Sequence, residues 1–372
     1  MRFLFWGAAA VVIYAYVGYA LVLFVITRLR QRPIVRHSIR PSVSVVIAVR
    51  NEERSLPAKL VNLARLTYPQ HLLEVVVVSD GSTDATAEIL LAAGPSVVPV
   101  LLPAVEGRSG GKAVALNEGV RRASGEILVF LDARQSVDPD AVTELVSCFA
   151  DAGVGAVSGE LLLESATGTE EGLGIYWKIE KTVRKLESDS GSTVGVTGAI
   201  YAMRRDLFRE IPPGTILDDV YVPMNVVKQG RRVIFLPSAV ARDQLFVEKG
   251  KEFSRKVRTL TGNYQLLRFA PWLLSPSNPV LFRFLSHKLA RLVVPLCLLL
   301  MLISSFVLPG AVYRTLFFLQ VSVYLLALVG ALSPRAQRFK PIGIAQTFVM
   351  LNIAAALAFY NFLVGRNRVW IR

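Results

Sequence analysis

Long stretches without charge lie near both ends of the chain, and a region of mixed pattern lies between them. Residues 3–27 contain no charged side chain, and a helix of about 20 apolar residues is enough to cross a bilayer. A cleaved signal peptide would have a shorter apolar region, of about 7–15 residues, and a small-residue cleavage site. We therefore predict an uncleaved transmembrane anchor over residues 1–28.

Five arginines follow this anchor closely, which favours the cytoplasmic side for the residues after it. They are Arg28, Arg30, Arg32, Arg36 and Arg40. A second membrane region is predicted over residues 289–365, because it contains three apolar runs that are each near spanning length. These runs cover residues 289–308, 313–332 and 341–365.

The side of the membrane on which the C-terminus lies is ambiguous. The loop 333–340 carries Arg335, Arg338 and Lys340, which suits a cytoplasmic turn, so a simple count of spans places the C-terminus outside. The tail, however, holds Arg366, Arg368 and Arg372, which favour the inside. The segment 341–365 could instead be re-entrant or interfacial, and the sequence leaves both alternatives open. Residues 266–288 mix aromatic and leucine side chains with arginine and proline, which predicts helices that lie in the interface.

The middle region, residues 41–265, alternates between two patterns. Continuous β-branched runs at 43–49, 74–80 and 126–132 are typical of strands buried on both faces. Helical spacing is found between such runs, over 51–66, over 112–123 and from Pro139 to about residue 150. This alternation predicts an α/β fold with a largely parallel sheet and flanking helices. In such a fold the ligand lies beyond the carboxyl ends of the strands.

Composition and charge narrow the class of protein. Hydrophobic residues make up 53% and charged residues 19%, whereas about 25% charged residues are usual in soluble domains, so part of the chain is expected in lipid. A net charge of +14 favours anionic partners, namely phosphates, lipid head groups or nucleic acid. Nucleic acid is disfavoured, because the arginine cluster follows a membrane span and no reader motif is present. Two cysteines and three scattered histidines argue against a zinc or histidine metal site.

Four aspartates are the candidate acids of a site at the sheet edge. Asp80 and Asp132 each follow a buried apolar run, where a charge is costly unless it has a partner or a function. Asp218 and Asp219 follow a Pro-Pro-Gly turn and precede a predicted helix through Lys228. Such a pair could simply cap the helix, or one member could be a general base that takes a proton from a hydroxyl.

Three basic residues are candidates for binding phosphate. Lys112 ends the glycine-rich segment 106–112, which is not a P-loop, because only three residues separate Gly107 from Gly111 and alanine follows the lysine. A mobile surface turn is the alternative to a loop that presents Lys112 to a diphosphate. Arg255 and Arg258 are three residues apart on a predicted helix, where they would contact either lipid head groups or a substrate diphosphate.

Taken in order, these segments resemble membrane-bound family 2 glycosyltransferases with a GT-A fold, a group that includes hyaluronan synthase-like, poly-N-acetylglucosamine synthase-like and cellulose synthase-like enzymes. The resemblance covers most of residues 41–265. The matching stretches are VSVVIAVRNEE (43–53), VVVVSDGSTDAT (75–86), GGKAVALNEGV (110–120), EILVFLDA (126–133), VGVTGAIYAMRR (194–205) and ILDDVYVPMNVVKQGRRVIFLPSAVA (216–241).

The resemblance implies a role for each candidate. Asp80 would contact the uracil of a UDP-sugar, supported by the turn that contains Asn51 and Glu53, and Lys112 would lie near the phosphates. Asp132 stands where the first acid of the DxD motif ligates Mg²⁺ or Mn²⁺. Asp219 stands at the last acid of the family's Glu-Asp pair and would be the catalytic base, with Asp218 in place of the glutamate.

Two positions depart from the family pattern. The second acid of the DxD motif is Arg134, so either Asp132 alone holds the metal or Arg134 offsets phosphate charge directly. The QxxRW motif of processive members is reduced to Arg255 and Arg258 followed by Thr259, which weakens the case for processive synthesis.

The sequence thus predicts an inverting glycosyltransferase that moves a sugar from a UDP-sugar to a lipid or glycan acceptor at the cytoplasmic face of the cell membrane. The bilayer is a partner in this interpretation, and nucleic acid is not. The alternative is a non-catalytic membrane protein whose nucleotide-binding domain acts as a sensor or scaffold. The arginine at position 134 permits that alternative, whereas Asp132, Lys112 and Asp219 argue against it.

Overall fold

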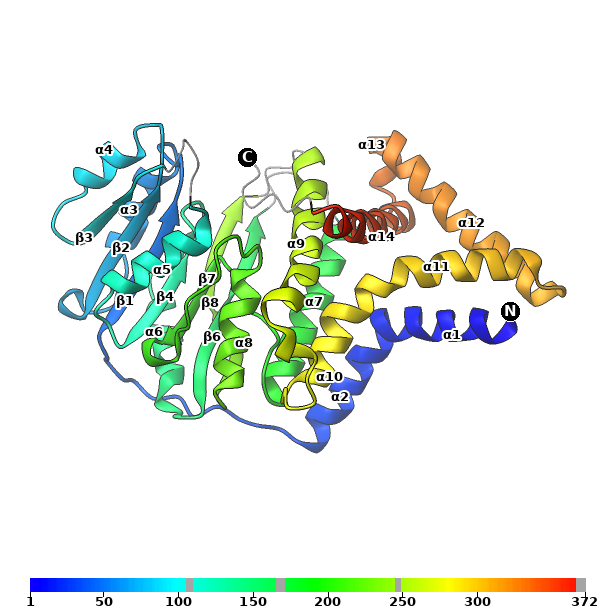
Figure 1. The fold of residues 1–372 in the computed structure, drawn as a ribbon, viewed down its shortest axis with the longest axis horizontal. Coiled ribbons are helices and arrows are strands. Elements are labelled where there is room, and N and C mark those ends of the chain that lie inside the picture. Colours follow the sequence, from blue (N-terminus) through cyan, green and yellow to red (C-terminus); the bar gives the residue numbers. More distant parts are fainter. Residues whose placement is uncertain (105–109, 165–170, 245–248, 366–372) are drawn as a thin grey trace.

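An eight-stranded sheet forms the centre of one half of the molecule, and long apolar helices form the other half (Figure 1). The computed structural model describes residues 1–104, 110–164, 171–244 and 249–365. Residues 105–109 of the predicted glycine-rich loop, and the arginines of the tail at 366–372, lie outside this description.

Four helices in the described part of the chain are long and apolar enough to cross a membrane. They are Arg2–Leu29, Leu281–Val307, Ala311–Leu332 and Lys340–Leu363. The first consists of α1 (Arg2–Ile13), a π-helical turn (Tyr14–Gly18) and α2 (Tyr19–Leu29); the second of α10 (Leu281–Phe284), a π-helical turn (Leu285–Leu289) and α11 (Ala290–Val307). The last two are α12 (Ala311–Leu332) and α14 (Lys340–Leu363), joined through the short α13 (Pro334–Gln337).

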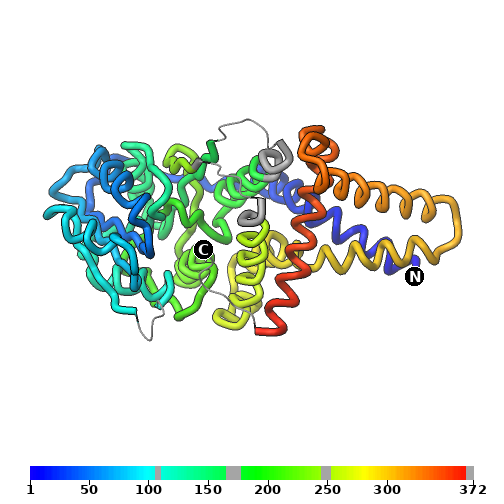
Figure 2. The backbone as a smooth tube through the Cα atoms, turned by 90° about the horizontal axis from the view of Figure 1, so that it is seen from above, coloured from blue at the N-terminus to red at the C-terminus, as the bar shows by residue number. Residues whose placement is uncertain are grey.

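The last long helix differs in direction from the others. In Figure 1, α1 and α11 run side by side away from the sheet, and α12 returns towards it. Figure 2 shows that α14 instead crosses this group, so that it lies between the other long apolar helices and the rest of the molecule. It contacts α9 (Lys249–Phe269) and α7 (Glu171–Asp189) on one side, and α11 and α12 on the other.

The stretch 266–288, which the sequence predicts as interfacial, is divided between different elements. The end of α9 and a short 3₁₀ helix (Pro271–Leu274) occupy its first part. The helix Leu281–Val307 begins within it, eight residues before the position at which the sequence predicts the second membrane region.

The sheet has the strand order β3-β2-β1-β4-β7-β6-β8-β5. The strands are β1 (Val43–Val49), β2 (Leu73–Asp80), β3 (Val97–Leu102), β4 (Ile127–Leu131), β5 (Ser136–Val137), β6 (Val154–Glu164), β7 (Ile200–Arg204) and β8 (Arg232–Gln244). The four strands β3, β2, β1 and β4 are parallel, as are β6 and β8. Between them, β7 is antiparallel to both β4 and β6, so the sheet is mixed, although mostly parallel as predicted.

The remaining helices flank this sheet. They are α3 (Leu56–Ala64), α4 (Thr86–Leu91), α5 (Lys112–Arg122), α6 (Ala141–Ser147) and α8 (Asp218–Lys228). Helix α3 starts five residues later than the spacing predicts, because Asn51 to Ser55 form a turn instead. Gly119 of α5 allows close packing on the sheet, since a Cβ there would lie 2.6 Å from Val46 Cγ1.

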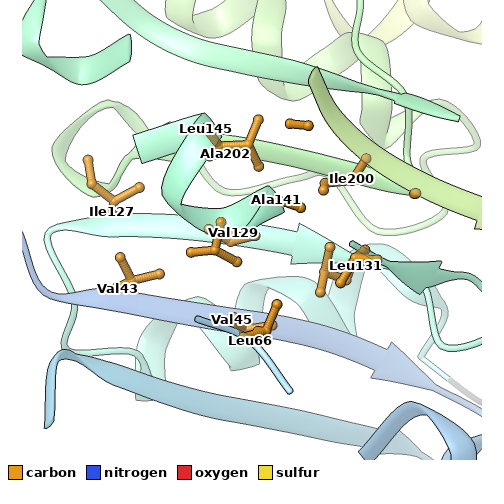
Figure 3. Packing of buried hydrophobic residues seen from close by; sticks show 14 of the residues in the cluster. Val43, Val45, Leu66, Ile127, Val129, Leu131, Ala141, Leu145, Ile200 and Ala202 are labelled. Atoms are coloured by element: carbon orange, nitrogen blue, oxygen red, sulfur yellow. The ribbon is translucent and has the colours of Figure 1, made fainter. Parts of the chain in front are cut away.

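Apolar side chains from several strands and from α6 meet in the larger of the buried clusters of the sheet domain (Figure 3). Those labelled in the figure are Val43, Val45, Leu66, Ile127, Val129, Leu131, Ala141, Leu145, Ile200 and Ala202. Because β1, β2 and β4 are parallel, their carboxyl ends share one edge of the sheet. The turn after β1, the end of β2 and the loop after β4 therefore face the same region, where the predicted site residues lie.

Candidate active site

The turns after β1 and β2 are hydrogen-bonded to each other at the carboxyl edge of the sheet. The main-chain N–H of Thr83 donates to Asn51 Oδ1 (2.8 Å), and the main-chain N–H of Glu53 donates to Asp84 Oδ2 (3.2 Å). Asn51 adopts a φ of 52°, a left-handed conformation that asparagine tolerates better than most residues. Asn51 and Glu53 thus hold the two turns together beside Asp80.

Asp80 is buried at the end of β2 and holds the loop that leads to Lys112. Its carboxylate oxygens accept hydrogen bonds from the main-chain N–H groups of Gly110 (2.9 Å) and Gly111 (2.8 Å), which offset the cost of burying its charge. Each carboxylate oxygen can accept two hydrogen bonds, so capacity is left for a donor on a nucleotide base. The structure therefore shows a loop-anchoring role for Asp80 that the sequence did not predict.

Lys112, at the start of α5, is the central cation of the site. Its Nζ lies 3.0 Å from Asp132 Oδ1 and 3.3 Å from Asp218 Oδ2. Burial alone would lower the pKa of Lys112, but the carboxylates of Asp132 and Asp218 raise it above its ordinary value. The lysine side chain is about one-quarter exposed, so this charged group still reaches solvent, where a ligand can approach.

The adjacent acids Asp218 and Asp219 occupy the first turn of α8, where the helix dipole favours negative charge. Burial and the neighbouring Asp218 carboxylate raise the pKa of Asp219 to about 6. Asp219 Oδ1 is buried and accepts no hydrogen bond from the described residues. A carboxylate with a raised pKa and an unused oxygen can accept a proton from an incoming hydroxyl.

Gly198 lies where these groups meet. A Cβ at this position would be 3.6 Å from Lys112 Nζ, 3.8 Å from Asp132 Oδ2 and 4.0 Å from Asp219 Cβ. The absence of a side chain leaves room among the charged groups. The structure therefore brings Lys112, Asp132, Asp218 and Asp219 together, although they come from three separate motifs.

Tyr201 is a site residue that the sequence analysis did not single out. Its ring stacks on Phe130 across β4 and β7 (centroids 4.7 Å apart), and its hydroxyl is buried with no hydrogen-bond partner among the described residues. Burial and the charges of Asp218 and Asp219 raise its pKa well above the ordinary value, so it remains a donor. A buried donor without a partner, close to the acids, is suited to bind a substrate oxygen.

Lys59 of α3 supports the loop that follows Asp132. Lys59 is buried and donates from Nζ to the main-chain oxygen of Gln135 (2.8 Å), and burial lowers the pKa of Lys59 to about 8. Arg134 pairs with the buried carboxylate of Asp243 on β8, which also accepts from Gln135 Nε2 (2.9 Å). Arg134 thus has a fixed acidic partner of its own, distinct from Asp132.

A divalent cation fits this site only if the protein and the nucleotide-sugar donor both supply ligands to it. Among the described residues, no group of three or more His, Cys, Asp or Glu side chains is placed to hold a metal ion. Asp132 Oδ1 is taken by Lys112, while the side chain as a whole is more than one-third exposed. Since Mg²⁺ is commonly bound by one or two carboxylates plus substrate phosphates, Asp132 with the donor diphosphate would be a sufficient ligand set.

The predicted phosphate-binding arginines lie on α9. This helix packs against the loop before the acids, because a Cβ on Gly262 would lie 2.6 Å from Leu217 Cγ, and Gln265 Oε1 accepts from the main-chain N–H of Ile216 (2.9 Å). Arg258 is one turn before Gly262 on the same helix face, whereas Arg255 is exposed. Among the described residues, Lys112 is the cation paired with Asp132 and with Asp218.

A buried charged cluster connects the site to the membrane helices. On α7, Glu180, Arg184 and Glu187 share one face, and Arg283, His287 and Arg291 share a face of the helix Leu281–Val307. His287 Nε2 lies 2.8 Å from Glu180 Oε1, and its Nδ1 lies 2.9 Å from Glu187 Oε1. An ionised carboxylate can only accept a hydrogen bond, so both ring nitrogens donate and the imidazole is cationic.

The N-terminal helix joins the same cluster. The Tyr19 hydroxyl donates to Glu187 Oε1 (2.5 Å), and Arg291 Nη1 lies 2.9 Å from Glu180 Oε2. The acids of α7 are thus bound by side chains of two membrane helices, α2 and α10–α11, which lie beside α7 in Figure 1. No motif indicated this cluster; its only trace in the sequence is a set of charges at helical spacing that flank an apolar run.

Residues 44–212 match the family model described as glycosyl transferase family 2. Among curated proteins, a probable glycosyltransferase of Bacillus subtilis (YdaM) is 26% identical over 241 residues, which are 62% of this chain and 57% of that protein. Poly-beta-1,6-N-acetyl-D-glucosamine synthase of Staphylococcus aureus (strain COL) is 24% identical over 248 residues, 64% of this chain and 58% of that protein. The matched region thus spans less than two-thirds of the length of these relatives.

Among solved structures, a mannosyltransferase from Pyrobaculum calidifontis, in complex with GDP-Man and Mn²⁺, has a TM-score of 0.73 with this chain. The two are 24% identical, and the match covers 97% of this chain and 99% of the other. At this identity the likeness shows a shared fold, and it extends over the membrane helices as well as the sheet domain. The predicted GT-A fold with flanking apolar helices is confirmed.

Proposed function

We propose that the chain is a family 2 glycosyltransferase that moves a sugar from a nucleoside-diphosphate donor to a hydroxyl of a membrane-associated acceptor, with inversion at the anomeric carbon. The observation that carries the proposal is the group formed by Lys112, Asp132, Asp218 and Asp219. It places a cation for the leaving diphosphate next to a carboxylate with an unused oxygen. A non-catalytic sensor would not need the second of these features.

Each side chain has a role in this proposal. Asp219 takes the proton of the acceptor hydroxyl as its oxygen attacks the anomeric carbon, and the bond from that carbon to the diphosphate breaks. Lys112 neutralises charge that develops on the leaving diphosphate. Asp218 holds Lys112 in place, and Tyr201 donates a hydrogen bond to a sugar oxygen. Asp80 positions the loop before Lys112, next to the base of the nucleotide.

A divalent cation, Mg²⁺ or Mn²⁺, would be held by Asp132 together with the donor phosphates. When bound, it supplies further positive charge for the leaving group. Arg134 stands in place of the family's second acid, and its charge is paired with Asp243, so Asp132 is the remaining acid of this motif for the cation. Arg258, on the face of α9 beside the acids, is a further candidate for the diphosphate, and Arg255 is placed farther out.

The donor nucleotide has two candidates. The family resemblance of the sheet-edge motifs favours a UDP-sugar. The solved mannosyltransferase was complexed with GDP-Man, so a GDP-sugar is the second candidate. For the acceptor, the apolar helices favour a lipid-linked molecule or a glycan held at the membrane.

A cytoplasmic sheet domain is supported by the direction of α14. If this helix lies along the membrane surface, as its crosswise position favours, the chain spans three times and both the loop 333–340 and the arginine-rich tail lie inside. The conflict in the sequence then disappears. Single cysteines at Gly310 and Gly365, labelled from outside, test this: labelling at Gly310 alone is expected, and labelling at Gly365 would contradict it.

The experiment for the function is release of nucleoside diphosphate by the purified protein in membranes, across a panel of UDP- and GDP-sugars, with Mn²⁺, with Mg²⁺ and with chelator. One donor is expected to turn over, and Asp219→Asn should reduce that turnover by about 10²- to 10⁴-fold, the usual contribution of a general base. Nucleotide binding by the variant should be unchanged. Full turnover by Asp219→Asn would exclude the assigned base.

A further inference from the structure

Lys288, on the helix Leu281–Val307, reaches the neighbourhood of Asp219. The Gly195–Gly198 segment crosses beneath the acids, and the main-chain N–H of Val196 donates to the Asp219 carbonyl (2.9 Å). A Cβ on Gly195 would lie 3.4 Å from that carbonyl oxygen and 3.8 Å from Lys288 Nζ. Gly198, at the other end of this segment, faces Lys112 and Asp132. One end of this segment therefore lies by Lys112 and Asp132, which we call the donor side of Asp219. The other end lies by Lys288, which we call the membrane side.

The ammonium group of Lys288 has no carboxylate of its own. In the described residues it makes neither a hydrogen bond nor an ion pair, because the neighbouring acids are bound by other groups. Glu180 binds His287 and Arg291, and Glu187 binds His287 and Tyr19.

Arg184 is a second cation in the surroundings of Lys288. Its guanidinium interacts electrostatically with both Lys288 and Asp219, and its ion pair with Glu180 is long, at 3.6 Å. Two cations side by side in a partly buried place repel each other unless an anion lies between them. Glu180 and Glu187 already bind His287, Arg291 and Tyr19, so no ion pair among the described residues offsets the charge of Lys288.

We propose that Lys288 and Arg184 form an anion-binding subsite on the membrane side of Asp219, which holds the phosphate ester of a lipid-linked acceptor. This rests on the proposed transferase function and specifies its acceptor class: a sugar joined through phosphate to a lipid chain. The chain lies along the membrane helices and the phosphate lies between the two cations. The sugar hydroxyl then points to Asp219, and the donor lies beyond it on the Lys112 side. The hydroxyl proton passes to Asp219, and the nucleoside diphosphate leaves with the electrons of the broken bond.

The same chemistry could come from bulk anionic phospholipid, so the test includes both sources. The probe is labelled polyprenyl monophosphate, bound to the full-length protein in neutral nanodiscs, with polyprenol as the uncharged comparison. Charge-assisted contacts predict binding about tenfold or more tighter for the phosphate than for the alcohol, and a loss of at least this size in Lys288→Met and Arg184→Gln. Lys288→Arg should retain most of the affinity.

Lys228→Met is the matched control, because it removes an ammonium from the far end of α8, where Lys228 lies over the Trp272 ring. It should bind the probe as the unaltered protein does. Displacement of the probe by phosphatidylglycerol as readily as by unlabelled probe would make this a head-group site and overturn the acceptor assignment. Equal affinity for the phosphate and the alcohol would also overturn it.

Two kinetic measurements separate this subsite from an effect through Asp219. With a polyprenyl-phosphate-linked sugar as acceptor, Lys288→Met should raise the KM for acceptor about tenfold and leave the KM for donor unchanged. With a phosphate-free glycolipid, at a pH well above the Asp219 pKa of about 6, the variant should show the same KM for acceptor as the unaltered protein. An equal loss with both acceptors would mean that Lys288 acts on Asp219 alone. Nucleotide binding, measured alongside, tests the transferase proposal independently, since it does not require the subsite.

Discussion

The donor side and the membrane side of the site are built in different ways. On the donor side, Asp80, Lys112 and Asp132 follow strands of one parallel sheet, and each belongs to a short motif visible in the sequence. On the membrane side, Glu180, Arg184 and Glu187 of α7 meet residues more than ninety positions later in the chain. A parallel sheet brings motif residues to one edge by its topology, whereas the membrane-side cluster exists only because two helices pack together.

The two sides also balance charge differently. Around Lys112 two carboxylates share one cation. An added cation or a phosphate–metal pair would offset the negative charge that remains. Around Lys288 no ion pair among the described residues offsets the ammonium charge, so an added anion would offset it. Asp219 lies between these regions and is influenced by both. The difference suggests that the site separates its two substrates by charge, with the metal-bound donor on one side and an anionic acceptor on the other.

The largest expected effect on stability tests the membrane side. Replacing Glu180 by leucine removes a carboxylate that His287, Arg291 and Arg184 share, and leaves the buried His287 with Glu187 as its remaining acid in the described cluster. These cations hold the pKa of Glu180 well below its usual range despite burial, so the ionised form is the partner that is lost. We expect the free energy of unfolding to fall by about 3–5 kcal/mol.

Thermal unfolding in neutral detergent measures this loss. Glu118→Leu is the control from the other side of the molecule, because Glu118 pairs with the exposed arginines Arg121 and Arg122 at the surface of α5. Its loss should stay below about 1 kcal/mol. Similar unfolding temperatures for the two variants would show that the cluster contributes no more than a surface pair.

The next effect tests the donor side. Lys112→Met removes the cation between Asp132 and Asp218 and leaves the two carboxylates without it. Donor affinity should fall by about 10- to 100-fold, since hydrogen bonds of charged groups contribute about 1.5–3 kcal/mol. Isothermal titration with the nucleoside diphosphate measures it, and binding of the lipid phosphate probe should be unaffected. A fall in both affinities would contradict the separation of the two substrates.

The smallest effect concerns pH, and it involves one residue from each side. Asp219 must be ionised to accept a proton, so kcat/KM should fall as pH decreases through about 6. This folded-state pKa lies above the ordinary value of 3.8, so the pH dependence of stability is opposite to that of activity. The stabilising contribution of Asp219 is greatest at low pH, where activity is lost. It is fully present below that ordinary value and is lost as pH rises through 6.

The fall of kcat/KM at low pH is the acidic limb of the pH profile. Substitutions around Asp219 should move this limb in opposite directions. Asp218 raises the pKa of Asp219, whereas Lys288, Lys112 and Arg184 lower it. The limb should therefore shift to lower pH in Asp218→Asn and to higher pH in Lys288→Met. The pH dependence of kcat/KM, with a phosphate-free acceptor, measures both shifts. A limb that stays in place in both variants would show that another group controls it.

The N-terminal part of the sheet was predictable, because its strands are continuous apolar runs and acids end two of them. The predicted positions of β1, β2 and β4 agree with the structure to within one residue at either end. The direction of β7 was not predictable, since its sequence has the same character whether it runs parallel or antiparallel to β4. The partner of Arg134 was also hidden, because Asp243 is more than one hundred residues away and belongs to no recognised motif.

By itself, the sequence indicated the resemblance to family 2 glycosyltransferases, the class of fold, the apolar helices and the candidate residues of the donor side. Local periodicity and short motifs are properties of neighbouring residues, so they can be read without coordinates. Only the tertiary structure decided that Asp80 anchors the loop before Lys112, that α14 crosses the other apolar helices, and that Lys288 reaches the segment beside Asp219. These depend on how separate helices and loops pack, and packing is set by side-chain shape and charge over distances along the chain that no local pattern records.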